Sequence, residues 1–221
     1  MTINPQEQLL DRYAEAVIQA PINLTSETDK AIFRQRHIGD VLLLNQHLVA
    51  EAIFPPASKI LDVGSGNGSP GLVLAILHPE WHLTLLDSSN KKCLFLDTFI
   101  KINAINNANV KCIRAEELAH TEAREAYDGV VCRALEKLPT AIELTLPFLK
   151  LSGHLIVSHG TSWKEELQRA ENGLKLLGGA FKKEIPYTVG DTTFHMLIFE
   201  KIQSTPERYP RNVGIPTKRP L

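Results

Sequence analysis

The chain has 221 residues, of which 43% are hydrophobic, and a formal net charge of -1 at pH 7. This length suits one α/β domain with an extension and is short for two independent domains. The near-neutral charge excludes a general electrostatic attraction to a polyanion. A nucleic-acid partner would therefore have to bind local basic patches.

The sequence contains no recognisable targeting or membrane segment. Its N-terminus lacks the basic start and apolar run of a signal peptide, and no apolar run approaches the roughly 18 residues of a membrane span. The three cysteines, Cys93, Cys112 and Cys132, are widely spaced and form no CxxC pair, as expected of reduced thiols. We therefore expect a cytoplasmic protein with no membrane partner.

Helical spacing of apolar residues dominates the first quarter of the chain. Residues 5–20 are predicted to form an amphipathic helix. Residues 27–54 carry two further helical patterns, of which the second runs from His37 to about Phe54, and Pro55 and Pro56 close this region. We assign residues 1–56 to an N-terminal helical extension.

From Ser58 onward, short apolar runs alternate with helical segments, which indicates βαβ units and a mostly parallel sheet. The last two apolar stretches, 180–189 and 192–201, are joined by two turn residues and predict an antiparallel hairpin at the sheet edge. Residues 57–203 are thus expected to form a doubly wound α/β domain. Residues 204–221 are rich in proline and carry four basic residues against one acid, so they predict an extended basic tail.

The stretch ILDVGSGNGSPG, residues 60–71, follows the first strand of this domain, where doubly wound folds bind nucleotides. Gly66, Gly68 and Gly71 match the dinucleotide pattern GxGxxG, but that match alone is weak. Asp62 would repel a nearby pyrophosphate, because like charges about 4 Å apart at an effective dielectric near 20 cost roughly 4 kcal/mol. An ammonium and a sulfonium would be favoured instead. Asp62-x-Gly64-x-Gly66-x-Gly68 therefore favours S-adenosylmethionine and a Rossmann-like class I methyltransferase fold.

Two further turns are expected to contact an adenosine. The second strand ends at Asp87, where a carboxylate can accept hydrogen bonds from both ribose hydroxyls; NAD would require the same acid. The alternative for Asp87-Ser88-Ser89 is the N-cap of the helix that follows. After the third strand, Ala115 would meet the adenine through its backbone, with Glu116 beside it. The alternative for Glu116 and Glu117 is that they are first-turn acids that satisfy a helix dipole.

The fourth strand, YDGVVCRAL, ends where methyltransferases present the transferable methyl group. It lacks the Asn/Asp-Pro-Pro-aromatic motif that holds exocyclic amines. Cys132 is a candidate nucleophile for methylation of a pyrimidine carbon, but no partner base accompanies it. Lys91, Lys137 and Lys164 form no recognisable arrangement for deprotonating a hydroxyl. What remains is an acceptor that already has a lone pair, such as a purine N7, for which catalysis is mainly positioning.

Arg133, the last polar residue of this strand, is predicted to anchor the methionine carboxylate of the cofactor or a nearby phosphate. It is therefore the residue to which we assign a catalytic role, acting by positioning rather than as an acid or base. The alternative is an ordinary ion pair with a neighbour such as Asp128.

Segments along nearly the whole chain resemble the RsmG (GidB) family of bacterial small-subunit ribosomal RNA guanine-N7 methyltransferases. The resemblance is carried by DVGSGNGSPGLVLAILHPEWHLTLLDSSNKKCLFL, RAEEL, YDGVVCRAL and LPFLKLSGHLIVSHG, by Asn23-Leu24-Thr25 with His37 and Asp40, and by Tyr209-Pro210-Arg211 with the last eight residues. It implies an S-adenosylmethionine cofactor and a substrate of 16S ribosomal RNA or the small ribosomal subunit.

The resemblance also implies that Gly64, Ser69, Ala115, Glu116 and Arg133 lie in the cofactor site, with Asp87 alongside. Together with the glycine-loop pattern, the predicted cofactor-binding residues are Asp62, Gly64, Gly66, Gly68, Ser69, Asp87, Ala115, Glu116 and Arg133. Two positions depart from the family. Ser69 stands where the family usually has Phe or Leu, and Gly39-Asp40-Val41 replaces Leu-Asp-Ser, which weakens any role for Asp40.

An RNA substrate requires cations that grip phosphates on either side of the target base, which must be unstacked because guanine N7 lies in a deep, narrow groove. We predict that Arg211, Lys218 and Arg219 in the tail and Arg36 and His37 near the N-terminal helices do so. The alternative for each cluster is a solvated face. His159 is expected beside the base pocket, and the scattered histidines predict no metal site.

Two other functions stay open at this stage. A dehydrogenase would use the GxGxxG match with NAD, but it would need a substrate domain after the sheet. A non-catalytic RNA-binding module would have an idle cofactor site. The nucleotide that is modified and the use of naked RNA or an assembled subunit are left open, and so is the oligomeric state, for which a monomer is expected.

Overall fold

The computed structural model describes residues 4–133 and 135–221. Seven strands form one sheet in the order β3-β2-β1-β4-β5-β7-β6. Neighbours among β1 to β5 run parallel, whereas β7 runs antiparallel to both β5 and β6. The strands are β1 (Lys59–Val63), β2 (His82–Asp87), β3 (Ala108–Cys112), β4 (Tyr127–Arg133), β5 (Leu149–His159), β6 (Gly179–Val189) and β7 (Thr192–Lys201). The predicted architecture, a parallel sheet with a final hairpin, is confirmed.

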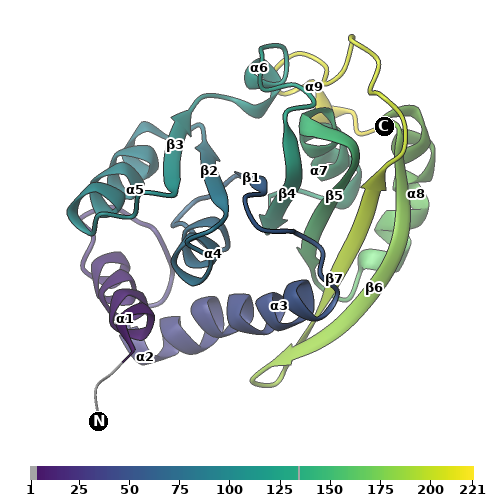
Figure 1. Cartoon of the computed structure of the whole chain (residues 1–221). Coiled ribbons are helices and arrows are strands. Elements are labelled where there is room, and N and C mark those ends of the chain that lie inside the picture. Colours follow the sequence, from purple (N-terminus) through teal and green to yellow (C-terminus); the bar gives the residue numbers. More distant parts are fainter. Residues whose placement is uncertain (1–3, 134) are drawn as a thin grey trace.

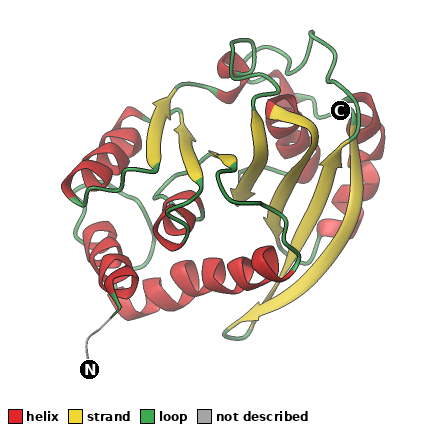
Figure 2. Ribbon diagram, viewed as in Figure 1, coloured by secondary structure: helices red, strands yellow, loops and turns green. Residues whose placement is uncertain are grey.

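Helices cover both faces of this sheet (Figure 2). They are α1 (Pro5–Ile18), α2 (Lys30–Phe33), α3 (Gly39–Ala50), α4 (Gly71–Leu77), α5 (Asn90–Ile102), α6 (Ala115–Leu118), α7 (Leu138–Thr145), α8 (Trp163–Leu176) and α9 (Ile215–Lys218). Two short segments complete the set: η1 (Arg34–Ile38) is a π-helical turn and η2 (Leu146–Phe148) is a 3-10 turn.

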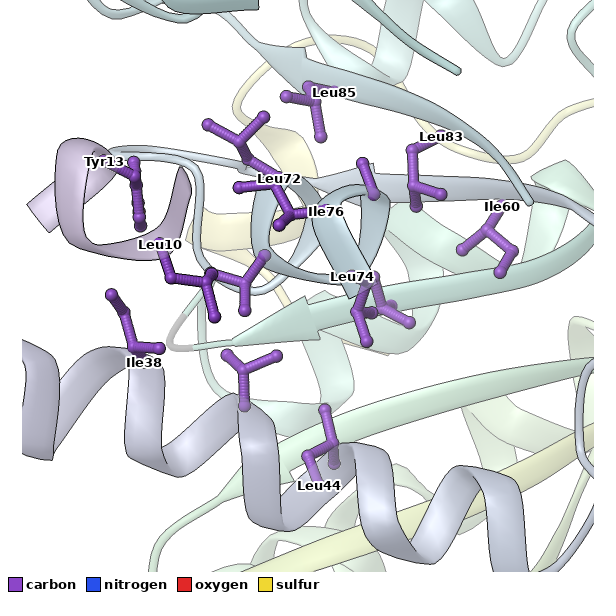
Figure 3. Close-up of a cluster of buried hydrophobic side chains, with 14 of the residues drawn as sticks. Leu10, Tyr13, Ile38, Leu44, Ile60, Leu72, Leu74, Ile76, Leu83 and Leu85 are labelled. Atoms are coloured by element: carbon purple, nitrogen blue, oxygen red, sulfur yellow. The ribbon is translucent and has the colours of Figure 1, made fainter. Parts of the chain in front are cut away.

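Two hydrophobic clusters lie on opposite faces of the sheet, and the period of two along each strand decides which side chain joins which cluster. In β1, Ile60 belongs to the cluster beneath α1, α3 and α4, whereas Leu61 and Val63 belong to the cluster beneath α6, α7 and α8. Figure 3 shows the first cluster, where Leu10 and Leu44 from the N-terminal helices meet the side chains of α4.

The N-terminal region differs in detail from the sequence expectation. Instead of two separate helices, the chain is helical from Lys30 to Ala50, because the π-helical turn η1 joins α2 directly to α3. The side chain of Asp29 caps the start of α2 by accepting a hydrogen bond from the Ile32 N–H at 3.0 Å. In Figure 1, α2 lies beside α1 and α3 extends from there towards β6, so the N-terminal segment packs against the sheet domain.

The C-terminal segment is not the extended tail that its composition predicted. Tyr209 and Pro216 are buried, and residues 215–218 form the short helix α9. Arg124 ties this segment down by donating hydrogen bonds to the carbonyls of Thr205 and Tyr209 at 2.6 and 2.8 Å. Because these contacts are specific and partly buried, they offset the conformational entropy that an extended tail would keep.

Candidate functional site

A cavity of about 290 Å³ opens at the carboxyl ends of β1, β2 and β3. This edge lies beside the β1–β4 junction, where the strand order reverses and doubly wound folds bind ligands. We call it the cofactor cavity. Its lining includes the predicted site residues Gly64, Asp87, Ala115 and Glu116, together with Val63, Leu86, Ser88, Lys92, Ile113, Arg114, Leu135, Glu136, Leu144 and Thr217.

Asp87, the last residue of β2, lies on the wall of the cofactor cavity. Its carboxylate accepts hydrogen bonds from the Gly66 N–H at 2.9 Å and from the Ser89 N–H at 2.8 Å. These contacts join the glycine loop to the end of β2. Helix α5 begins at Asn90 with Ser89 as its N-cap, so the Asp87-Ser88-Ser89 stretch does hold the start of this helix, with Asp87 supporting Ser89 through its carboxylate.

The three predicted glycines of the loop differ in whether they line the cofactor cavity. Gly64 lines the cavity with a φ of +76°, and a Cβ built on it would lie 2.4 Å from Cδ1 of Leu135. Glycine avoids both the strain of positive φ and this clash. Gly66 acts through its N–H, while Gly68 packs against Leu72 and Leu96. Of the predicted loop glycines, Gly64 therefore lies on the cavity wall and the other two shape the turn behind it.

Asp62 does not line the cavity, contrary to the expectation that it faces a cationic ligand. It alternates with Leu61 and Val63 along β1, so it points to the opposite face, beneath the start of α4, and is fully buried. Its Oδ2 accepts a hydrogen bond from the Gly71 N–H at 3.0 Å. Burial raises the pKa of this carboxyl from 3.8 to about 7. Asp62 thus organises the turn into α4.

Asp62→Asn is expected to change how stability depends on pH. Between pH 3.8 and 7 the folded protein holds the Asp62 proton more tightly than the unfolded chain, so the free energy of unfolding falls as pH rises through this window. The decrease is on the order of 2–4 kcal/mol, at 1.36 kcal/mol per pKa unit. Asparagine removes this contribution while keeping an acceptor for Gly71.

Thermal unfolding at pH 5 and pH 8 measures this effect. The difference between the unfolding temperatures at pH 5 and pH 8 should be smaller in Asp62→Asn than in the wild type. It should stay as in the wild type in Asp97→Asn, which changes a partly exposed carboxylate paired with Lys101 at 2.6 Å. An unchanged gap in Asp62→Asn would show that the buried carboxyl is not the source of the pH dependence.

Glu116 lies in the first turn of α6, at the edge of the cofactor cavity, and is almost fully buried. Its Oε1 accepts hydrogen bonds from the Gly214 N–H at 3.0 Å and from Arg114 at 3.4 Å. Glu117 beside it is exposed. The carboxylate that sequence alone could assign to a helix dipole is therefore a contact that holds the C-terminal segment against the cavity.

Arg133 lies in a second cavity of about 290 Å³, at the carboxyl ends of β4 and β5. We call this the acceptor cavity; it shares the wall residues Leu135 and Glu136 with the cofactor cavity. The alternative for Arg133, an ordinary ion pair, is met with a different partner from Asp128, which binds Lys150 at 2.6 Å. Arg133 instead pairs with Asp40 at 2.9 Å. The remaining lining comprises Cys132, Ala141, Val157, Ser158, His159, Gly160 and Phe194.

Asp40 is the residue whose place the sequence interpretation misjudged. It lies in the first turn of α3 and is 1% exposed. A signal was present in the sequence, because Asp40 shares the apolar helix face of Val41, Leu44 and Leu48, where an acid needs a buried partner. The partner itself, on a strand more than ninety residues away, was not predictable from that pattern.

Two other candidates line the acceptor cavity. Cys132 is buried, and burial raises the pKa of its thiol well above the usual range. A thiolate nucleophile is therefore disfavoured there. His159 lies on the cavity wall as expected, with Nε2 3.2 Å from a carboxylate oxygen of Glu166.

The predicted RNA-binding residues divide into fixed and exposed groups. Arg211 forms a two-pronged pair with the buried Glu143, with contacts of 2.9 and 2.6 Å, so its side chain is engaged within the protein. Burial lowers the pKa of His37 to about 4, and its ring stacks on Phe33. Arg36 is exposed but pairs with Glu27 at 3.0 Å. Lys218 and Arg219 are exposed at the end of α9.

Over residues 4–133 and 135–221, no group of three or more His, Cys, Asp or Glu side chains is arranged to hold a metal ion. No helix in that same part of the chain has the length and apolar character needed to cross a membrane.

Comparison with known proteins gives matches in both sequence and structure. The family model described as rRNA small subunit methyltransferase G matches residues 6–191. The ribosomal RNA small subunit methyltransferase G of Pseudothermotoga lettingae is 38% identical over 213 residues, covering 96% of this chain and 90% of that protein.

Solved structures share the fold at lower identity. An rRNA methylase from Streptococcus thermophilus superimposes with a TM-score of 0.53 at 20% identity, covering 73% of this chain and 96% of that one. A mutant of MtNAS in complex with S-adenosylmethionine gives a TM-score of 0.61 at 13% identity, covering 89% of this chain and 73% of that one.

Proposed function

Since the chain belongs to the rRNA small subunit methyltransferase G family, we propose that it transfers a methyl group from S-adenosylmethionine to N7 of a guanine in 16S ribosomal RNA. The names of the relatives include the small-subunit rRNA and the methyl transfer. The guanine, its N7 atom and the roles of individual residues are our inference. Ribosomal RNA as substrate favours the cytoplasm as the place of this reaction.

The observation that carries the proposal is the pair of adjoining cavities at the carboxyl edge of the sheet, divided by Leu135 and Glu136. A transferase needs two such sites, because the donor and the acceptor must meet in line. The cofactor cavity fits an adenosine, since Asp87 offers a carboxylate fixed by the Gly66 N–H and Gly64 lets the chain turn closely past Leu135 on the cavity wall. The acceptor cavity would receive the guanine.

The chain's own contribution is positioning. When bound, S-adenosylmethionine supplies an electrophilic methyl group carried on a sulfonium. Guanine N7 attacks with its own lone pair, so no residue has to remove a proton. This agrees with an acceptor cavity in which the buried Cys132 thiol has a strongly raised pKa. Orientation of the two partners can supply several kcal/mol of the barrier reduction.

The two alternatives are less well supported. A dehydrogenase has no support among the relatives, which are methyltransferases. A non-catalytic RNA-binding module would leave the cofactor cavity without a function. The label-transfer experiment below distinguishes such a module from a methyltransferase.

The direct test is incubation of the protein with small ribosomal subunits that lack 7-methylguanosine, in the presence of S-adenosylmethionine labelled in the methyl group. Digestion to nucleosides should place the label in 7-methylguanosine. Label in another nucleoside would contradict the N7 assignment, and binding of the subunit without any label transfer would favour the non-catalytic module. Free 16S RNA as a second substrate distinguishes naked RNA from the assembled subunit.

Lys218 and Arg219 are expected to contribute to RNA affinity through phosphates. If about four cations contact phosphates, the logarithm of affinity should fall with the logarithm of salt concentration at a slope near -3, at about -0.7 per contact. Replacing both by alanine should therefore make the slope shallower by about 1.4.

Titration of small-subunit RNA at several salt concentrations measures this slope. Lys101→Ala is the matched control, because Lys101 is exposed at the C-terminal end of α5, towards the amino edge of the sheet and away from both cavities. An equal change of slope in the control and in the double variant would show that Lys218 and Arg219 make no specific contact with RNA phosphates.

A further inference from the structure

The ion pair between Asp40 and Arg133 joins the N-terminal helix α3 to the carboxyl end of β4. Oδ2 of Asp40 lies 2.9 Å from Nη1 of Arg133, and the side chains are only 2% and 17% exposed. Removing two charges from water costs free energy that their attraction often fails to recover, so a buried pair is weak evidence for a purely stabilising role. Arg133 lies on the wall of the acceptor cavity, and this position indicates another role for its buried partner.

Ser69 of the glycine loop contacts the same guanidinium. Its Oγ accepts a hydrogen bond from Nη1 of Arg133 at 3.3 Å and donates one to the His37 carbonyl at 3.4 Å. Three segments that are distant in sequence therefore hold one side chain: α3 with the turn before it, the loop after β1, and the end of β4.

In the described part of the chain, both contacts of Arg133 use Nη1. A guanidinium carries five N–H donors in a rigid fork, so donors remain for an anionic group. An arginine whose charge is already fixed on one side presents those donors in one orientation, and this lowers the cost of ordering it when a ligand arrives.

We propose that Asp40 is a positioning residue for methyl transfer, which fixes the Arg133 guanidinium at the acceptor cavity with the help of Ser69. The N-terminal helix α3 is then part of the reaction site and not only a cover for the sheet. This inference rests on the proposed function, because that function assigns the cavity lined by Arg133 to the guanine.

The test is a double-mutant cycle on the full-length protein with small ribosomal subunits and S-adenosylmethionine. Asp40→Asn should lower kcat by about 10- to 100-fold, as expected for a misplaced active-site group. Arg133→Gln should lower it at least as far. Asp40→Asn added to Arg133→Gln should cause no further decrease, because a positioning residue has nothing left to position. A merely structural role would lower kcat by the same factor in both backgrounds.

Asp128→Asn is the matched control, since this acid pairs with Lys150 at the opposite end of β4, and it should keep the wild-type kcat. Asp40→Glu, which retains the charge, should recover part of the rate. If Asp40→Asn alone does not fold, Arg133→Gln and the double variant, which leaves no unpaired buried charge, still give the decisive comparison. A further decrease in the double variant overturns the proposal, as does a wild-type kcat in Asp40→Asn.

The result with the wild-type protein distinguishes a failure of this inference from a failure of the proposed function. If the wild type forms no 7-methylguanosine, the proposed function fails, whatever the variants do. If the wild type forms it and the cycle is additive, only the role of Asp40 fails.

Discussion

Asp87→Ala is expected to weaken the binding of S-adenosylmethionine and of its demethylated product by at least about 100-fold. Hydrogen bonds to a charged group contribute roughly 1.5–3 kcal/mol each, and two ribose hydroxyls would lose theirs together. Each 1.4 kcal/mol corresponds to about a factor of ten in affinity. The variant also removes the acceptor for the Gly66 and Ser89 N–H groups, so the wall of the cofactor cavity loses its support.

Isothermal titration calorimetry with the demethylated product measures this affinity without turnover. Asp97→Ala provides the control, because that acid lies on the outer side of α5 in an ion pair with Lys101 and should leave the affinity unchanged. Asp87→Asn should bind with intermediate affinity, since it keeps one acceptor and loses the charge. Wild-type affinity in Asp87→Ala would mean that the adenosine does not use the end of β2.

Arg211→Ala is expected to destabilise the protein by about 3 kcal/mol. Removing one partner of a buried ion pair typically costs about 3–5 kcal/mol, because the other charge is left unpaired. We expect the lower end because Glu143, which is fully buried, would still accept a hydrogen bond from the Arg211 main-chain N–H at 2.9 Å. At roughly 2–4 °C per kcal/mol for a chain of this size, Tm should fall by roughly 6–12 °C.

The same variant tests the assignment of Arg211 to RNA binding. Thermal unfolding of Arg211→Ala is compared with that of Arg219→Ala, whose exposed side chain should change Tm by less than about 2 °C. Arg211→Lys should lie between wild type and Arg211→Ala, because lysine keeps the charge and loses the two-pronged contact. If Arg211→Ala unfolds at the wild-type temperature but binds RNA weakly, the side chain serves RNA and the pair with Glu143 is incidental.

Loss of the Arg211 side chain is also expected to affect the cofactor cavity. The C-terminal segment that Arg211 holds also places Gly214 on Glu116 and Thr217 on the cavity wall. A loosened C-terminal segment is therefore expected to weaken cofactor binding in addition to lowering Tm, which links the stability of this segment to the site.

The sequence by itself determined the order of the elements and the location of the site. Alternating short apolar runs and helices encode a parallel sheet, and the carboxyl ends of its strands must meet at one edge. Gly64, Asp87, Ala115 and Glu116 lie at the end of a strand or within four residues after it, so their convergence on one cavity follows from the strand order. The local sequence pattern is therefore sufficient to predict a site residue that lies at or just after the end of a strand.

Only the tertiary structure decided which partner each charged side chain meets. The period of two along β1 turns Asp62 beneath α4, and the long-range pairs of Asp40 with Arg133 and of Glu143 with Arg211 join segments that no local pattern relates. The physical reason is that a charge in the interior must find an opposite charge or a donor wherever the packed chain supplies one. Sequence spacing predicts that such a partner is needed, and the folded chain selects it.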